Sequence, residues 1–487
     1  MKKNNKDKRV FLENHPMKTR RDFLAQGFIS GLTYTMAPSI LSTLYSRNAM
    51  AQQGMCAAVD PNVVGKTPVI IFDLAGGANI AGSSVIVGGA GGQADFLQDY
   101  TTLGLPPDMH PSMAGQTNNE LGLMFHTDSP FLRGIQAQTN AATRANVDGG
   151  IFCTSSSDDT ANNPHNPAYW LSKAGAQGGL TALAGTRNTD SGGRSTVPPM
   201  SFDPTLQPVI LNRPSDALGL VNVGKLGELF PDDKVQKILK AVERMSEAKV
   251  MSFANQSLPM QVKELVKCGY IGTNELISKY TPEALDPSLD PMVMQAFNNL
   301  NDGDQRKTAT VAKMVLDGHI GAGTIEDGGY DYHNGTRSRG EVRDFQAGEL
   351  IGRVLELARL KNTPVMIYVY TDGSVTARAE VDNSNDGRGK YNWTGDSGQR
   401  SSSMMLLYNP GSRAVLRTGR RQIGHFKETG SVENSAMVTS NSVINLAKAV
   451  VANYMSLHGD EANIANVVGD NPFGANLDQY LLFNKIV

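Results

Sequence analysis

The chain has 487 residues, of which 40% are hydrophobic, 19% charged and 7% aromatic. This composition is typical of a globular protein and excludes a disordered chain or a disulfide-rich scaffold. The 45 Lys and Arg residues against 47 Asp and Glu residues give a formal net charge of -2. The chain therefore lacks the basic excess that binding to a nucleic-acid backbone requires, and we expect no nucleic-acid partner.

The first fifty residues have the pattern of an export signal. Residues 1–21 hold eight Lys or Arg, and the following stretch up to Leu44 is largely uncharged. Arg20 and Arg21, followed by Phe23 and Leu24, resemble the twin-arginine export motif. The sequence therefore predicts that the twin-arginine export machinery is a partner and that the folded protein is periplasmic.

A small-x-small cleavage site ends at Ala51, so we expect residues 1–51 to be removed and the mature protein to begin near Gln52. The alternative is a membrane anchor or an amphipathic surface helix, because about 18 uncharged residues just reach the length of a bilayer span. Thr33, Thr35 and Pro38 make the stretch polar and broken. We therefore expect no stable membrane anchor after cleavage.

Three apolar runs are predicted as buried strands that end in polar turns. Residues 67–73 lead into a glycine-rich loop, residues 150–153 into a serine-rich segment, and residues 365–370 into Thr371-Asp372-Gly373-Ser374. Strands of this kind indicate a parallel sheet whose carboxyl edge carries the chemistry. We expect Asp73, Ser155, Asp331, Asp372 and Asp396 to gather at that edge.

Helices are predicted from 3.6-residue periodicity. One at 350–358 directly precedes the third strand, as a crossover connection requires, and others are expected at 232–256 and 441–457. The region from about 206 to 305 has the pattern of a helical insertion. The fold class predicted is α/β, with a largely parallel sheet between layers of helices.

Two further features limit the chemistry. The glycine-rich stretch from Gly82 to Gly92 contains no Lys and is not followed by the Gly-Lys-Ser/Thr of a phosphate-binding loop, so we expect no nucleotide cofactor. Cys56, Cys153 and Cys268 are too few and too far apart to form a metal cluster, and we expect them to be structural.

The segment Gly328-Gly329-Tyr330-Asp331-Tyr332-His333 is the most informative. In an extended loop Asp331 and His333 leave the same face, which suits a carboxylate and an imidazole that share a divalent cation. The alternative is a capped turn without a ligand.

Three further carboxylates are candidate metal ligands with Asp331 and His333. Asp73 ends the first predicted strand, Asp372 directly follows the third, and Asp396 lies in the acidic loop at residues 393–398. Several carboxylates at one edge are costly unless water or cations neutralise them. Asp372 and Asp396 can instead cap helices or close turns.

A nucleophile is harder to identify. Ser83 and Ser84 are the first hydroxyls in the loop after the first strand and are the candidates, against the alternative of ordinary loop residues. His165, between Pro164 and Pro167, can face the same edge or serve as a structural residue.

These motifs, in this order, resemble the exported domain of unknown function 1501 family, which belongs to the alkaline-phosphatase-like superfamily. The resemblance implies one α/β domain over residues 52–487 and one or two divalent cations held by Asp and His at the ends of strands. The chain departs from the family pattern at Tyr332, where the family has Thr, and at Asp372, where it has Glu. It also has Ser397 where the family has a His, which the resemblance implies to be a metal ligand.

Two functions remain open. The chain is either a periplasmic metal-dependent hydrolase of phosphate or sulfate esters, or a degenerate exported scaffold or envelope-assembly protein with an envelope partner. Oxygen-rich ligands favour Mn, Mg or Ca over Zn. The missing imidazole at Ser397 predicts weak binding.

Overall fold

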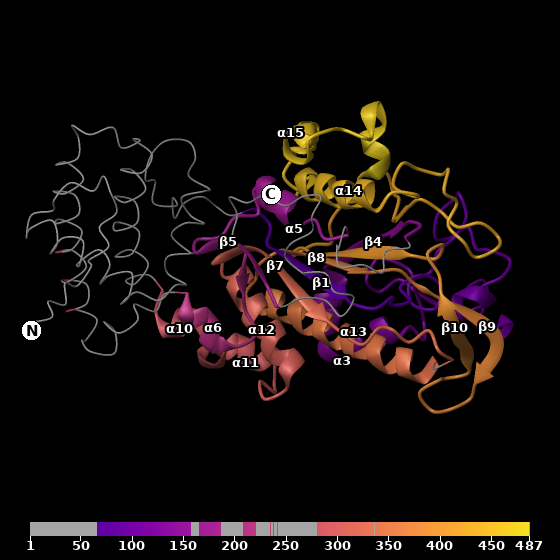
Figure 1. Cartoon of the computed structure of the whole chain (residues 1–487), viewed down its shortest axis with the longest axis horizontal. Helices are drawn as coiled ribbons and strands as arrows, with labels where there is room; N and C mark the ends of the chain where they lie inside the picture. Colours follow the sequence, from indigo (N-terminus) through magenta and orange to yellow (C-terminus); the bar gives the residue numbers. More distant parts are fainter. Residues whose placement is uncertain are drawn as a thin grey trace, which may run out of the picture.

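The computed structural model describes residues 66–156, 165–186, 208–220, 280–335 and 337–486, together with the helical residues Lys234, Lys237 and Ala241. At the centre of this described part lies an eight-stranded sheet with helices on both faces (Figure 1). Its strand order is β12-β4-β11-β8-β1-β7-β5-β6. The strands are β1 (Val69–Leu74), β4 (Val147–Cys153), β5 (Thr181–Gly185), β6 (Val209–Ile210), β7 (Ile320–Asp327), β8 (Val365–Thr371), β11 (Ser402–Tyr408) and β12 (Gln422–Ile423).

The sheet is largely parallel. β1 runs parallel to β7 and β8, β5 runs parallel to β7 and β6, and β12 runs parallel to β4. Of the strands that the structure describes in this sheet, β11 alone runs against both of its neighbours. The predicted α/β class with a largely parallel sheet between helices is therefore confirmed.

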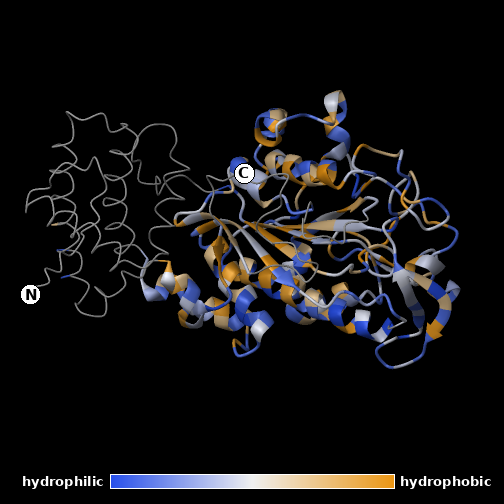
Figure 2. Ribbon diagram, viewed as in Figure 1, coloured by the Kyte–Doolittle hydropathy of each residue, from blue (hydrophilic) through white to orange (hydrophobic). Residues whose placement is uncertain are grey.

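Each face of the sheet carries its own apolar core, as the hydropathy colouring in Figure 2 illustrates. Along β1, Ile70 and Phe72 belong to one core, and Val69 and Ile71 to the other, as the alternation of a strand requires. The first core is covered by α3 (Pro130–Gln138), α12 (Gly303–Leu316) and α13 (Arg337–Leu360); the second is covered by α5 (Ala168–Lys173), α14 (Val443–Ser456) and α15 (Ile464–Val468).

Smaller elements complete the described chain. A two-stranded hairpin of β9 (Val375–Asp382) and β10 (Lys390–Asp396) contacts α13, and β2 (Thr117–Asn118) pairs with β3 (Phe125–His126). The short helices are α4 (Ala141–Ala145), α6 (Pro214–Gly219), α10 (Pro282–Leu285), α11 (Pro291–Ala296) and the 3-10 turns Thr101–Leu103, Pro107–Met109, Pro287–Leu289, Glu461–Asn463 and Gly474–Tyr480.

Most predicted elements that fall on described residues are confirmed. The strands at 67–73, 150–153 and 365–370 correspond to β1, β4 and β8, and the helices at 350–358 and 441–457 to α13 and α14. Of the helix predicted at 232–256, only Lys234, Lys237 and Ala241 are described. The predicted helical insertion at 206–305 needs a correction, because its described part includes β6, which pairs with β5.

The export signal lies outside the described residues, as do Cys56 and Cys268. Within the described part of the chain, no helix combines the length and the apolar character needed to cross a membrane. Cys153, at the end of β4, is a buried free thiol whose pKa is raised by burial.

Candidate metal centre

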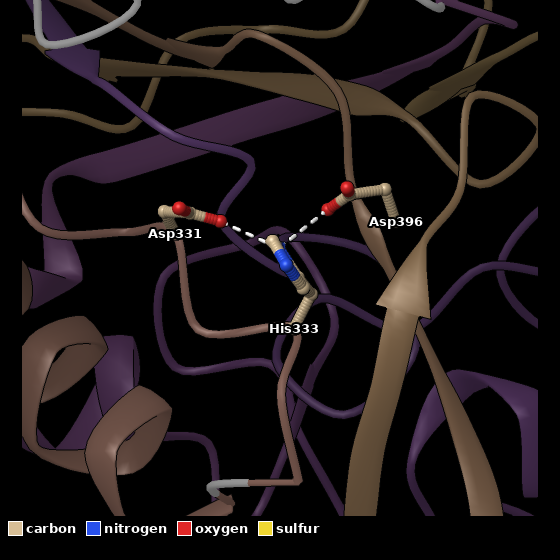
Figure 3. Close-up of side chains that lie close together, drawn as sticks. All are labelled: Asp331, His333 and Asp396. Carbon is tan, nitrogen blue, oxygen red and sulfur yellow. Dashed lines mark ion pairs between the residues drawn. The ribbon is translucent and has the colours of Figure 1, made fainter.

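Asp331, His333 and Asp396 converge at the carboxyl edge of the sheet, and Figure 3 shows the two carboxylates on opposite sides of the imidazole. The Nδ1 atom of His333 lies 2.5 Å from Oδ1 of Asp331 and 2.8 Å from Oδ1 of Asp396. One donor atom from each residue lies within 4.8 Å of the other two. Both carboxylates are exposed, so a cation from solvent has access to this group, which we call the Asp-His-Asp group.

Tyr330 and Tyr332 orient the loop that carries two of these ligands. Both tyrosines are fully buried, whereas Asp331 and His333 alternate with them and face outward. The Tyr330 hydroxyl donates to Asp327 at 2.8 Å. The extended alternation explains why Asp331 and His333 share a face, and that prediction is confirmed.

Tyr332 links the loop to two other elements. Its hydroxyl donates to Oδ1 of Asp344 on α13 at 2.9 Å and accepts from the backbone N–H of Asn79 at 2.6 Å. Burial raises the pKa of Asp344 well above its ordinary value, and nearby Glu341 raises it further. Tyr332 therefore fixes the loop against both the segment after β1 and α13.

Gly76 allows the loop after β1 to pass directly behind Asp331. Its φ is +120°, and a Cβ there would lie 2.5 Å from the backbone nitrogen of Asp331. A larger residue would collide with backbone, which cannot rotate away. The glycine-rich turn after β1 thus positions a ligand-bearing loop without contributing a side chain to the site.

Asp396 comes from the last residue of β10 and depends on how the hairpin docks. The backbone N–H of Ser397 donates to the carbonyl of Ser374, after β8, at 2.7 Å. On the other side, Trp393 is buried, and the Arg337 guanidinium of α13 lies 4.4 Å from the centre of its ring. These contacts hold Asp396 opposite His333.

A buried ion network joins the same hairpin to α13 and α3. The Lys390 ammonium lies 2.8 Å from Glu341, which also pairs with Arg337 at 2.5 Å and with Arg133 at 2.9 Å. Burial raises the pKa of Glu341, but the charges of Lys390 and Arg337 outweigh it and leave that pKa lowered. Glu341 is therefore ionised at neutral pH and binds the hairpin.

Asp73 and Asp372 lie in a different environment from the Asp-His-Asp group. Both are buried, and both carboxylates lie near the Tyr370 hydroxyl. Burial raises the pKa of Tyr370, and the charges of Asp73 and Asp372 raise it further. The predicted set of ligands is thus divided: Asp331, His333 and Asp396 come together, while Asp73 and Asp372 border Tyr370.

His165 completes this second, buried set. Its ring stacks on Tyr370 with centroids 5.7 Å apart, and its Nε2 lies 3.0 Å from the Ser156 hydroxyl. Burial lowers the pKa of His165 to about 3, so the ring is neutral at pH 7. Ser155, the residue before Ser156, donates to Asn434 at 2.5 Å. His165 therefore has the hydrogen-bonded, buried setting of a structural residue.

Ser83 and Ser84, the candidate nucleophiles, are both buried. The Ser83 hydroxyl donates to Oδ1 of Asn79 at 2.7 Å. Neither hydroxyl is accessible to an ester, which argues against both as nucleophiles. The reason is local: the chain after Gly82 turns into the core, where Val85 is fully buried.

The donor set fits a hard divalent cation. Two carboxylate oxygens and one imidazole nitrogen leave coordination positions for water or a substrate. Ligand atoms around one cation are spaced by about 3 Å, given bonds of about 2.1 Å. The Nδ1–oxygen distances of 2.5 and 2.8 Å are slightly shorter than this spacing, so a bound cation would require the three side chains to spread slightly.

Sequence reasoning missed the residues that hold the group together. Lys390, Glu341 and Asp344 are buried charged residues whose pairing is set by tertiary contacts. Tyr332 had a signal, since alternating tyrosines flank Asp331 and His333 in an otherwise polar loop.

No family model and no curated protein matches the chain. Among solved structures, a magnesium-bound mutant of TAB5 alkaline phosphatase shares 12% identity, with 84% of this chain and 99% of that chain covered and a TM-score of 0.22. Ps i-CgsB shares 10% identity, with 85% and 75% covered and a TM-score of 0.24. A second Ps i-CgsB structure, in complex with k-i-k-neocarrahexaose, has a TM-score of 0.22. Likenesses with such low TM-scores carry no argument about the activity of this chain.

Proposed function

We propose that the protein is a metal-dependent hydrolase of phosphate or sulfate monoesters, with the Asp-His-Asp group as its cation site. The observation that carries this proposal is the convergence of Asp331, His333 and Asp396 at a solvent-accessible point of the sheet edge. The resemblance of its motifs to the domain of unknown function 1501 family and the alkaline-phosphatase-like superfamily supports the same class of reaction.

The chemistry follows from the donor set. A bound divalent cation supplies polarisation of an ester oxygen and a water molecule of lowered pKa. Asp331 and Asp396 would hold it through oxygen, and His333 through Nδ1. The oxygen-rich set favours Mn, Mg or Ca over Zn. Because Ser83 and Ser84 are buried, the proposal uses no serine nucleophile.

The second candidate is a degenerate scaffold or envelope-assembly protein on the same fold. It is favoured by Ser397, which stands where the family pattern has a histidine. In the structure Ser397 accepts a hydrogen bond from Arg400 at 2.8 Å, so the position forms a local polar contact. The two candidates differ in whether the protein binds a cation and turns over an ester.

The test is calorimetry of the mature protein with Mn²⁺, followed by assays with p-nitrophenyl phosphate and p-nitrophenyl sulfate. We expect saturable Mn²⁺ binding and turnover of one of the two esters, both abolished in His333→Ala. Asp386→Asn, on the same hairpin but outside the group, is the control and should behave like the wild type. If the wild type binds no Mn²⁺ at millimolar concentration, the hydrolase proposal is wrong and the degenerate scaffold is the better explanation of the fold.

We also propose that the chain is exported through the twin-arginine route and cleaved near Ala51. The support is the Arg20-Arg21 pair with Phe23-Leu24 ahead of an uncharged stretch. Changing Arg20 and Arg21 together to Lys should leave a full-length precursor in the cytoplasm. Normal periplasmic recovery of that double variant would contradict the proposal.

A further inference from the structure

A polar cavity of about 550 Å³ opens beside the edge strand β12. Its walls come from the glycine-rich stretch after β1, at residues 90–94, and from residues 418–422 with His425. The volume falls in the range of small-molecule sites, which is roughly 300–1,000 Å³. The cavity lies beside β12, whereas the Asp-His-Asp group takes its residues from the loop after β7 and from β10, and the two share no residue.

The charge of the cavity wall is positive. The described residues that line it include Arg420, Arg421 and His425 but no Asp or Glu. Arg421 is neutralised from behind by buried Asp148, through two hydrogen bonds of 2.7 and 2.8 Å. Arg420 donates to the backbone carbonyl of Gln479 at 2.9 Å, and no ion pair to it occurs among the described residues. Its charge is therefore available to a ligand.

Two buried glutamines hold the wall in place. Gln93 donates to the carbonyls of Ile86 and Met124, at 2.6 and 3.0 Å, and accepts from the Met124 N–H. Gln422 accepts from the Gly88 N–H and donates to the Gly88 carbonyl, both at 2.9 Å. Because these amides use their hydrogen bonds on the backbone, they make the cavity rigid before any ligand arrives.

The remaining wall groups are suited to an oxyanion. His425, Asn119 and Gln479 also line the cavity, and within the described part of the chain no hydrogen bond involves their side chains, so these groups can bind a ligand together with Arg420. No Phe, Tyr or Trp lines the cavity among the described residues, so it lacks the broad stacking surface that sugars and bases commonly use. Gly92 and Gly419, where a Cβ would meet nothing within 4 Å, leave room for a substituent.

We propose that this cavity binds a small molecule that bears a phosphate or sulfate group, with Arg420 as the main charge contact and His425 as a second donor. A guanidinium and an imidazole that converge on one oxyanion give charged hydrogen bonds stronger than neutral ones. The site does not depend on the proposed hydrolase activity, because it shares no residue with the Asp-His-Asp group.

The test is calorimetry with glucose 6-phosphate, inorganic phosphate, inorganic sulfate and glucose. We expect the phosphorylated probe to bind and glucose not to bind; the two inorganic ions show which oxyanion the site prefers. Arg420→Gln should weaken binding about tenfold, as the loss of one charged hydrogen bond implies.

Arg413→Gln is the matched control, because Arg413 lies on the same segment outside the cavity and also donates to backbone carbonyls. It should bind the probe like the wild type, as should Asp331→Asn in the metal group. Absence of binding by all three anions, equal binding of glucose, or an equal loss in Arg413→Gln would overturn the proposal.

Discussion

The Nδ1 atom of His333 lies 2.8 Å from Oδ1 of Asp396, although one residue follows a strand of the main sheet and the other ends the β9–β10 hairpin. Asp331, by contrast, belongs to the same loop as His333. The Asp-His-Asp group therefore combines two residues of one loop with a third, Asp396, from the β9–β10 hairpin, which docks separately. The contacts that dock the hairpin should control cation affinity as directly as the ligands do.

The first prediction concerns Lys390, which is fully buried and lies 2.8 Å from Glu341. Lys390→Met should lower the free energy of unfolding by about 3 kcal/mol, because it removes one partner of a buried ion pair and leaves Glu341 less compensated. It should also weaken Mn²⁺ binding, since Asp396 moves with the hairpin. Urea unfolding and calorimetry measure the two effects.

The control for Lys390 is Arg378→Met, on the neighbouring strand of the hairpin. Arg378 pairs with Glu380, but both side chains are more than half exposed. Exposed pairs contribute about 1 kcal/mol or less. If both variants lowered the free energy of unfolding equally, burial of the Lys390–Glu341 pair would not explain its contribution to stability.

The second prediction separates a ligand from general surface charge. Asp396→Asn should weaken Mn²⁺ binding about tenfold or more, because it replaces a charged oxygen ligand with a neutral one. Asp386→Asn removes the same charge from the turn of the same hairpin. If both variants lost affinity equally, long-range charge and not ligation would explain the binding of the cation.

The sequence predicted what depends on local pattern. The strand–turn units identified β1, β4 and β8, and the two-residue spacing of Asp331 and His333 predicted their shared face. It did not predict β7, because Gly321 and Gly323 interrupt the apolar run. In the structure a Cβ on Gly321 would lie 2.0 Å from the carbonyl oxygen of Ala176, and one on Gly323 would lie 2.5 Å from Val311. Those glycines mark close packing that only the folded chain reveals.

The sequence also could not predict which of the candidate carboxylates would be buried and which exposed. The sequence placed Asp372 and Asp396 in two acidic loops of one predicted edge, yet Asp372 is buried near Tyr370 and Asp396 is exposed opposite His333. The difference comes from the hairpin between them, whose strands leave the main sheet and form a sheet of their own. The spacing of residues along the chain does not predict that β9 and β10 form a separate sheet.

The third prediction concerns the Tyr332 hydroxyl. Tyr332→Phe should destabilise the protein by about 1–3 kcal/mol, because the buried Asn79 N–H loses its acceptor and Asp344 loses a donor. Thermal or urea unfolding measures the change. Tyr391→Phe, at a buried tyrosine of β10 for which no side-chain hydrogen bond occurs in the described residues, should cost far less. Similar losses in both variants would mean that the hydroxyl contacts of Tyr332 contribute little.

The last prediction is a pH dependence that arises at His165. Burial lowers the pKa of this histidine from 6.5 to about 3. Below pH 6.5 the unfolded chain takes up a proton that the folded chain does not, so stability falls as the pH drops toward 3. Each such histidine contributes a slope of up to about 1.4 kcal/mol per pH unit in that window. Burial lowers the pKa of His126 and of His458 to about 4, so they contribute in the upper part of the same window.

His165→Gln removes one of these proton-binding sites and should flatten the pH dependence of the unfolding free energy by about 1.4 kcal/mol per pH unit between about pH 6 and pH 4. Ser156→Ala is the matched control, because it removes the hydrogen-bond partner of His165 and leaves the buried ring. It should lower stability by a similar amount at every pH, since burial is what shifts the pKa of His165. Urea unfolding at pH 4, 5, 6 and 7 distinguishes the two. A His165→Gln protein whose stability falls as steeply as that of the wild type would show that the ring is already protonated in the folded state.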